Sequence, residues 1–412
     1  MIRAMKKIAI IGGGASGMMA AITAARLGAS VTIYEHKDRV GKKILTTGNG
    51  KCNLTNLSVS KDDYRGNHPS FVMSVLKEFP VAATLRFFEE LGLLWKERSG
   101  CVYPVSNQAS TVLDLLRSEL KRLGVTVLTE CGKVSLKPVH KNQRGGFVLT
   151  CAAGGGHFDR VIIAAGGKAA PVTGSDGSGY ALAKSMGHRL VPVLPALTAL
   201  KGEESFFKPV AGVRVDAGLS LYIEDALCAE EMGELQLTAQ GPSGIPVFQL
   251  SRFAVEALSR QKRVHLVCDF LPQYTAEQLE KSLAFRRQRG LSAEEALTGI
   301  LNKKLLFLLL KQCGIRPSEP LASNPASKMQ QFCHIIKHCR MPITGYASFE
   351  QAQVCQGGVD TSQLHADLES AICKGLYFAG EIVDVDGICG GYNLQWAWSS
   401  GYVAGRAAAD II

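Results

Sequence analysis

The run Lys7-Ile8-Ala9-Ile10-Ile11-Gly12-Gly13-Gly14-Ala15-Ser16-Gly17 decides the fold of this 412-residue chain. An apolar stretch of strand length stops at glycines with G-x-G-x-x-G spacing, and small residues suited to a helix follow. The pattern predicts a strand over 8–11, a helix over 15–27 and a second strand over 30–35. These elements make a βαβ unit, which opens a parallel sheet.

Each glycine of this turn has a physical role in binding a dinucleotide. Gly12 permits the tight turn, Gly14 lets the main chain approach a pyrophosphate, and Gly17 lets the helix pack on the strand. The pyrophosphate would lie at the helix N-terminus, beside Ala15 and Ser16, because free N–H groups and the helix dipole favour negative charge there.

Glu35 is expected at the end of the second strand, near the ~20-residue offset at which a carboxylate accepts the hydroxyls of an adenosine ribose. A carboxylate at this place repels a 2′-phosphate. The sequence therefore favours FAD or NAD over NADP. The alternative to dinucleotide binding is a glycine-rich turn without a ligand, in which Glu35 is a surface residue.

A polar segment over 41–56 follows the ribose-binding strand and favours FAD over NAD, because it can cover a longer cofactor. Its glycines permit close backbone approach, and its polar side chains can bond phosphate, ribityl or flavin oxygens. A solvent loop is the alternative. We expect Cys52 to be a packed residue rather than a redox thiol, because no partner cysteine lies near it in sequence. The candidate contacts are Lys42, Lys43, Thr47, Gly48, Gly50, Lys51, Cys52, Asn53 and Thr55.

Two further buried strands, over 161–165 and 376–379, are expected in the same sheet. The segment that begins at Gly390 opens a helix running towards Ala409, and its N-terminus would stabilise the negative charge of a reduced flavin. The candidate contacts are Gly166, Gly380, Glu381, Gly391, Asn393 and Leu394, and Tyr392 is a candidate proton donor.

The predicted secondary-structure pattern changes between about 195 and 371, from a strand–helix–strand order to short strands followed by helices. Such a change is expected for an inserted domain. Short strands are predicted over 220–223, 234–238 and 264–268, and helical periodicity over 275–312. The length of 412 residues also predicts two or three domains.

The net charge of +10 suits an anionic ligand. Lysines and arginines are scattered, and no basic tract with interleaved aromatic residues occurs in the sequence, which argues against nucleic acid as a partner. A flavin-bearing RNA-binding or regulatory protein stays open as an alternative of another class.

The twelve cysteines are dispersed without a C-x-x-C pair, which predicts reduced thiols in the cytoplasm. The group formed by Cys333, His334, His338 and Cys339 lacks the usual spacing of zinc ligands, so no metal is expected. No segment reaches the about 18 to 20 apolar residues of a membrane span. The sequence carries no signal of the oligomeric state.

Together these segments resemble the BaiN/YhiN-type flavoproteins, which are bacterial FAD-dependent oxidoreductases. The resemblance covers nearly the whole chain and also rests on the run Thr173-Gly174-Ser175-Asp176-Gly177-Ser178-Gly179-Tyr180. It implies an α/β protein with a Rossmann-like FAD-binding domain, an inserted β-barrel-like domain and a small helical subdomain. The expected ranges are 1–194 and 372–412 for FAD binding, 195–273 and 337–371 for the β-rich insert, and 274–336 for the helices. The resemblance also implies that the Val134 backbone faces the adenine.

The resemblance implies reduction of an activated C=C bond in a small molecule such as a bile-acid enone. The electrons would come from transiently bound NAD(P)H, since no second G-x-G-x-x-G unit is present to hold it as disulfide reductases do. Oxidation of small amines such as aminoacetone is the alternative. In the insert, Ala239 stands where many members have a histidine, so no role of that histidine is carried over and substrate choice stays open.

Overall fold

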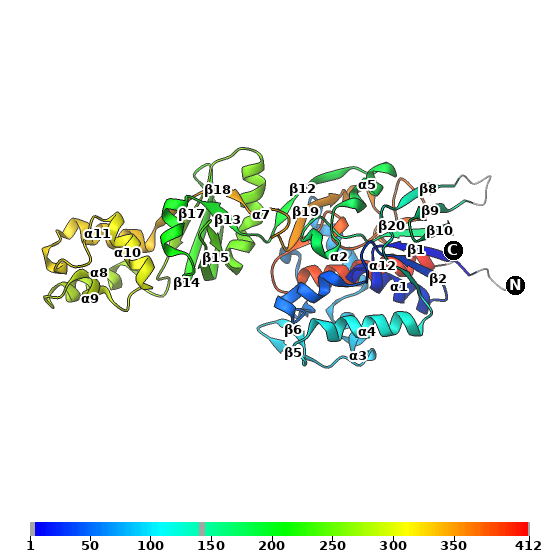
Figure 1. The fold of residues 1–412 in the computed structure, drawn as a ribbon, viewed down its shortest axis with the longest axis horizontal. Helices are drawn as coiled ribbons and strands as arrows, with labels where there is room; N and C mark the ends of the chain where they lie inside the picture. The colour runs from blue at the N-terminus through cyan, green and yellow to red at the C-terminus, as the bar shows by residue number, and fades with distance from the viewer. Residues whose placement is uncertain (1–4, 140–144, 411–412) are drawn as a thin grey trace. The chain divides into compact units, whose positions relative to one another are not determined.

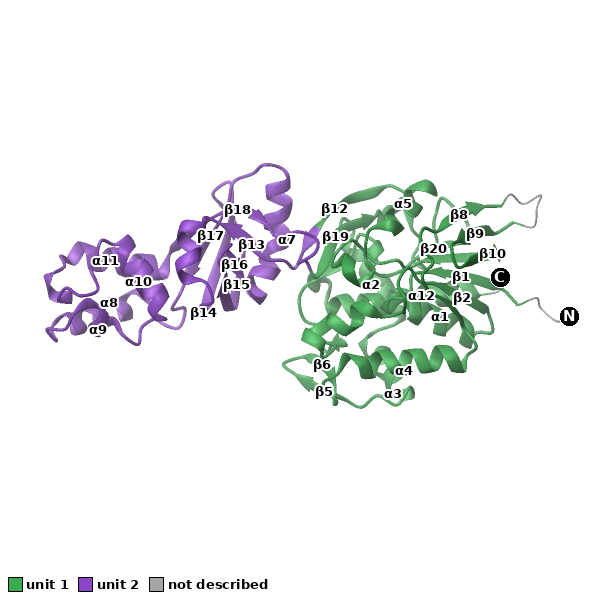
Figure 2. Cartoon of the chain, viewed as in Figure 1, with its two compact units in different colours: residues 1–194, 353–412 green, residues 195–352 purple. Residues whose placement is uncertain are grey.

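The computed structural model describes residues 5–139 and 145–410, and the chain divides into two compact units. The first unit comprises residues 1–194 and 353–412, and the second comprises residues 195–352 (Figure 2). The second unit is thus inserted between two parts of the first.

The first unit is built on a five-stranded parallel sheet with the order β20-β11-β1-β2-β7 (Figure 1). Ile10 in the central strand lies opposite Ile162 on one side and Ile33 on the other. The expected strands therefore join one sheet, as predicted. The strands are β1 (Lys7–Ile11), β2 (Ser30–Tyr34), β7 (Thr126–Leu128), β11 (Arg160–Ile163) and β20 (Leu376–Phe378).

Helices from the two ends of the chain pack against each other in this unit (Figure 1). They are α1 (Ala15–Arg26) and α12 (Tyr392–Ala409). A β-carbon on Gly401 would lie 2.4 Å from the Ser16 carbonyl oxygen, and one on Gly405 would lie 2.5 Å from that of Ala20. These glycines therefore bring the C-terminal helix into direct contact with the helix that follows the glycine turn.

Smaller elements complete the first unit. β3 (Thr55–Asn56), β6 (Cys101–Pro104) and β5 (Trp95–Arg98) form one small sheet, and β8 (Ser135–Pro138), β9 (Phe147–Cys151) and β10 (Gly154–Phe158) form another. The remaining pairs are β4 (Tyr64–Arg65) with β21 (Asp386–Gly387), and β12 (Leu190–Ala196) with β19 (Val354–Val359). The further helices are α2 (Pro69–Glu78), α3 (Val81–Glu90), α4 (Ala109–Arg122) and α5 (Ser178–Ser185).

A six-stranded antiparallel sheet with the order β13-β18-β17-β14-β15-β16 forms the base of the second unit. Its two edges meet, because the Gly202 N–H donates to the Gln240 carbonyl at 2.9 Å, so the sheet closes into a near-barrel. Helix α7 (Ile245–Ser259) packs against it. The strands are β13 (Leu200–Gly202), β14 (Arg214–Ile223), β15 (Ala226–Leu237), β16 (Pro242–Ser243), β17 (Val264–Asp269) and β18 (Cys339–Tyr346).

Between β17 and β18 the chain forms α8 (Ala276–Arg287), α9 (Ala293–Leu297), α10 (Lys303–Gln312) and α11 (Ala326–Lys337). The periodicity read over 275–312 is therefore divided among three helices. Ser292 and Asn302 cap two of them with their side chains, which starts a new helix at each position. The fold class is thus confirmed, and the expected domain bounds stay predictions.

Candidate functional site

The glycine turn connects β1 to α1 as the sequence predicts. Gly12 has φ +104°, and a β-carbon there would lie 2.4 Å from the Ala164 carbonyl oxygen. A side chain at this position would therefore separate the turn from the strand beside it.

The N-terminus of α1 has free hydrogen-bonding capacity and open space before it. Gly14 is its N-cap, and no side chain caps the first turn. A β-carbon on Gly14 would meet nothing within 4 Å. The N–H groups of the first turn, beginning at Ala15 and Ser16, therefore suit the pyrophosphate of a dinucleotide.

Glu35 follows β2 immediately, and main-chain groups hold its carboxylate. One carboxylate oxygen accepts the Gly13 N–H at 2.8 Å, and the other accepts the Lys37 N–H at 2.7 Å. The side chain is thereby fixed at the glycine turn. Gly13 was not among the predicted contacts, because its role depends on this contact with the end of the next strand.

The polar segment after β2 is only partly the loop that the sequence suggested, because η1 (Lys42–Gly50), a 3₁₀ stretch with a kink, occupies most of it. Thr47 donates from Oγ1 to the Ile44 carbonyl at 2.6 Å. Cys52 is fully buried, and burial raises the pKa of its thiol to about 12. Gly48 and Gly50 have positive φ, and Gly50 and Lys51 are exposed.

Three segments that lie far apart in the sequence meet around this site. Lys43 Nζ lies 2.7 Å from Glu381 Oε2, in η8 (Gly380–Ile382). Ser16 Oγ donates to the Ala379 carbonyl at 3.3 Å. The Asn53 amide, in the orientation that satisfies both partners, accepts the Gly391 N–H at 3.2 Å and donates to the Thr55 carbonyl at 3.1 Å. The structure therefore brings together the predicted contacts from both ends of the chain.

Gly391 caps α12 with a left-handed backbone, and no side chain caps that helix. Asn393 accepts the Gly387 N–H at 2.9 Å and donates to the Gly387 carbonyl at 2.8 Å, so its amide orders the preceding turn. Tyr392 is 8% exposed, and burial raises the pKa of its hydroxyl. Leu394 is half-buried.

The remaining predicted contacts lie around these segments. Lys42 pairs with Asp38 at 2.5 Å, and Thr55 donates from Oγ1 to Gln395 at 2.6 Å. Gly166 follows β11 and lies beside Ser175. Val134 lies three residues beyond Cys131, whose N–H donates to the Glu35 carbonyl at 3.0 Å.

Cys355 in β19 was not among the predicted site residues either. Its N–H donates to Glu381 Oε1 at 3.0 Å, and its Sγ accepts the Lys168 N–H at 3.1 Å. The only local signal was the glycine pair at 357 and 358, because glycines within an apolar strand often mark close backbone approach.

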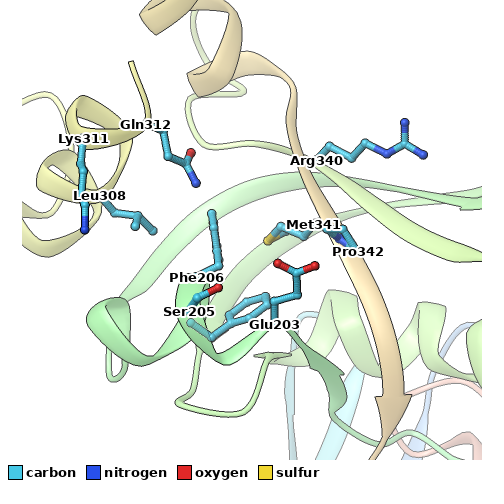
Figure 3. A pocket seen from close by; sticks show the side chains of 10 residues that line it. Glu203, Ser205, Phe206, Leu308, Lys311, Gln312, Arg340, Met341 and Pro342 are labelled. Atoms are coloured by element: carbon cyan, nitrogen blue, oxygen red, sulfur yellow. The ribbon is translucent and has the colours of Figure 1, made fainter. Parts of the chain in front are cut away.

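The second unit holds a separate hollow of about 380 Å³. Figure 3 shows Phe206 between α10, which carries Leu308 and Lys311, and β18, which carries Arg340 and Met341. None of the predicted FAD contacts lines it. In the same unit, Ala239 is exposed on a turn in which Thr238 Oγ1 donates to the Gly241 carbonyl at 2.8 Å.

Comparison with known proteins identifies the family. The model of the HI0933-like protein Rossmann domain matches residues 6–407. The chain belongs to the HI0933-like family. The resemblance to BaiN/YhiN-type flavoproteins is thereby confirmed, and the chain is an FAD-dependent oxidoreductase.

Curated relatives of this HI0933-like chain match nearly its whole length. It is 47% identical to a 3-dehydro-bile acid delta(4,6)-reductase of Clostridium scindens, over 98% of this chain and 100% of that protein. It is 30% identical to a ribosomal RNA dihydrouridine synthase of Haemophilus influenzae, over 95% of this chain and 96% of that protein. It is 29% identical to a ribosomal RNA dihydrouridine synthase of Escherichia coli, over 98% of this chain and 97% of that protein.

Two further features of this HI0933-like chain concern the described residues alone. Within residues 5–139 and 145–410, no helix has both the length and the apolar character needed to cross a membrane. In the same ranges, no group of three or more His, Cys, Asp or Glu side chains is arranged to hold a metal ion.

Proposed function

We propose that this enzyme reduces a C=C bond conjugated to a ring carbonyl in a small substrate of the bile-acid type, with electrons from NAD(P)H. The observation that carries the proposal is the 47% identity to the bile acid reductase over essentially both chains. That relative's name describes a 3-oxo compound with double bonds at positions 4 and 6, which are conjugated to the carbonyl.

The cofactor supplies the two-electron chemistry, and the residues of the first unit would bind and orient it. The N-terminus of α1 would hold the pyrophosphate, and Glu35 the ribose hydroxyls. The Lys43–Glu381 pair would fix η1 against the C-terminal segment. The positive end of the α12 dipole, at Gly391, would stabilise negative charge that develops during reduction.

NADH or NADPH is proposed as a transient donor because the full sequence contains one G-x-G-x-x-G turn, which the FAD would occupy. Anaerobic mixing of the yellow enzyme with each nicotinamide tests this step. We expect loss of the flavin absorbance with at least one of them. An enzyme that dithionite reduces but neither nicotinamide reduces would contradict the proposed donor.

The reduced enzyme should then be mixed with a 3-oxo-Δ4,6 bile acid under anaerobic conditions. We expect the flavin absorbance to return and one molecule of product, with one ring double bond fewer, to form per reduced flavin. A matched 3-oxo bile acid without ring double bonds should leave the flavin reduced. Reoxidation by neither compound would contradict the proposed reaction, as would peroxide release from aminoacetone and O2 in a separate aerobic assay.

A second candidate is reduction of uridine in RNA, which two relatives with 30% and 29% identity support. The chemistry is comparable, because the C5=C6 bond of uracil is also conjugated to a carbonyl. Two basic side chains of the helical segment are, however, engaged within the protein. Arg286 donates to the Ala296 carbonyl and Arg287 to the Asn324 carbonyl, each at 2.6 Å.

Salt-dependent RNA binding separates the two candidates. Binding of ribosomal RNA that weakens steeply with salt, together with dihydrouridine formation, would support the second candidate. Activity with the bile acid and none with RNA would support the first.

A further inference from the structure

The small sheet β3-β6-β5 lies against the predicted FAD segments of the first unit. Cys101 and Tyr103 are two residues apart in β6, so their side chains point to the same face. Cys101 lies opposite Asn56 of β3, the strand that follows the polar segment. The sheet therefore places a thiol and a phenol beside the site.

Contacts connect both side chains to two of the segments that meet around the site. Tyr103 Cε1 lies 3.5 Å from the position that a β-carbon on Gly48 would take. Cys101 Sγ donates to the Gly390 carbonyl at 3.7 Å, and Asn56 Nδ2 donates to the same carbonyl at 3.1 Å. Tyr103 thus borders η1, and Cys101 borders the N-terminus of α12.

The Cys101 thiol lies on the same face of β6 as the Tyr103 ring and is close enough to raise the pKa of the Tyr103 hydroxyl. Tyr103 is half-buried, so ligands can reach the ring, whereas Tyr392 is 8% exposed. The Tyr392 ring also packs edge-on against Tyr64 at 6.1 Å between centroids. Of these two tyrosines, Tyr103 is the more accessible to a substrate.

We propose that Tyr103 is the proton donor of this site and that Cys101 is a positioning residue for its hydroxyl. The inference rests on the proposed function. In the reduction, the bound cofactor would supply the hydride for the β-carbon of the enone, with electrons from NAD(P)H. The Tyr103 hydroxyl gives its proton to the α-carbon, and a proton from water restores it. One H⁻ and one H⁺ thus convert C=C into CH–CH.

The groups around this tyrosine keep it protonated at neutral pH. Burial raises the pKa of Tyr103, Cys101 raises it further, and Arg98 of β5 opposes the shift. On the α12 side, burial together with Asp63 and Cys101 raises the pKa of Tyr392. Activity that depends on protonated Tyr103 is therefore retained through neutral pH and falls only above about pH 10.

Stopped-flow measurement of the two half-reactions of Tyr103→Phe tests the proposal. We expect flavin reduction by NAD(P)H within about 3-fold of wild type and reoxidation by the enone slowed roughly 100-fold or more. The variant should also show a changed solvent deuterium isotope effect on reoxidation, because its proton then comes directly from water. Cys101→Ala should slow reoxidation by a smaller factor, and Cys101→Ser should restore most of it.

Tyr377→Phe is the matched control, because this buried tyrosine donates to the Ala407 carbonyl of α12. It should leave both half-reactions unchanged. Reoxidation of Tyr103→Phe within 3-fold of wild type would overturn the proposal, as would equal slowing of both half-reactions with loss of FAD. A wild-type enzyme that is reduced but that no enone reoxidises would instead refute the proposed function.

Discussion

The Glu35 carboxylate is held by two main-chain N–H groups, those of Gly13 and Lys37. Hydrogen bonds to a charged group are worth about 1.5–3 kcal/mol. The residue therefore both orders the glycine turn and would present its remaining lone pairs to the ribose.

Replacing Glu35 with alanine is expected to raise the Kd for FAD roughly 10- to 100-fold, because the turn and the ribose both lose an acceptor. Fluorescence titration of the apoenzyme measures this change. Glu130→Gln, which alters an exposed carboxylate nearby, should leave the Kd unchanged. Equal Kd values for wild type and Glu35→Ala would refute the assigned role.

Cys52 is expected to resist alkylation in the folded enzyme. With a pKa of about 12, its thiolate fraction at pH 8 is about 1 in 10,000, and the side chain is fully buried. The exposed Cys228 serves as the internal comparison. After iodoacetamide treatment, mass spectrometry should find Cys228 modified and Cys52 intact. Comparable modification of both would contradict the packing described for Cys52.

Residue-level prediction from the sequence succeeded where the signal was local. The spacing of Gly12, Gly14 and Gly17 indicated the turn directly. The parts played by Gly13 and Cys355 depend on partners 22 and 26 residues away. Tyr103 likewise approaches Gly48 only because β6 pairs with β3. Such pairings leave no local pattern.

Two helices, α1 and α12, form the close contact that brings the chain's ends together. Gly401 faces the Ser16 carbonyl, and Gly405 faces the Ala20 carbonyl. Overpacking such a contact costs about 1–3 kcal/mol.

Gly405→Val is therefore expected to lower the free energy of unfolding by at least about 2 kcal/mol and to weaken FAD binding. Urea unfolding of the apoenzyme measures the first effect. Ala407→Val, two positions along at a half-buried site, is the matched control and should cost less than about 1 kcal/mol. Equal destabilisation by both would contradict the close contact at Gly405.

At the scale of elements, the sequence predicted the C-terminal helix and four of the five strands of the parallel sheet correctly, and it missed β7. It did not predict how 275–312 divides, since an apolar pattern continues across Gly290 and Gly299 while the caps at Ser292 and Asn302 start new helices. The 3₁₀ stretch η1 was also missed, because its kink at Thr47–Asn49 follows no regular period.

For the whole molecule, the main consequence of the fold is that segments from both ends of the chain lie together in the first unit. Sequence reasoning predicted this convergence, because each segment carries glycines at the end of a strand. The sheet order β20-β11-β1-β2-β7 could not be derived, since strand order depends on long-range pairing.

Hydrogen–deuterium exchange of the apoenzyme with and without FAD tests the convergence most directly. We expect FAD to slow exchange together in three segments, 12–17, 42–55 and 380–394, with no comparable change at the hollow in the second unit. Protection of the glycine turn alone, or protection confined to residues 195–352, would contradict the account.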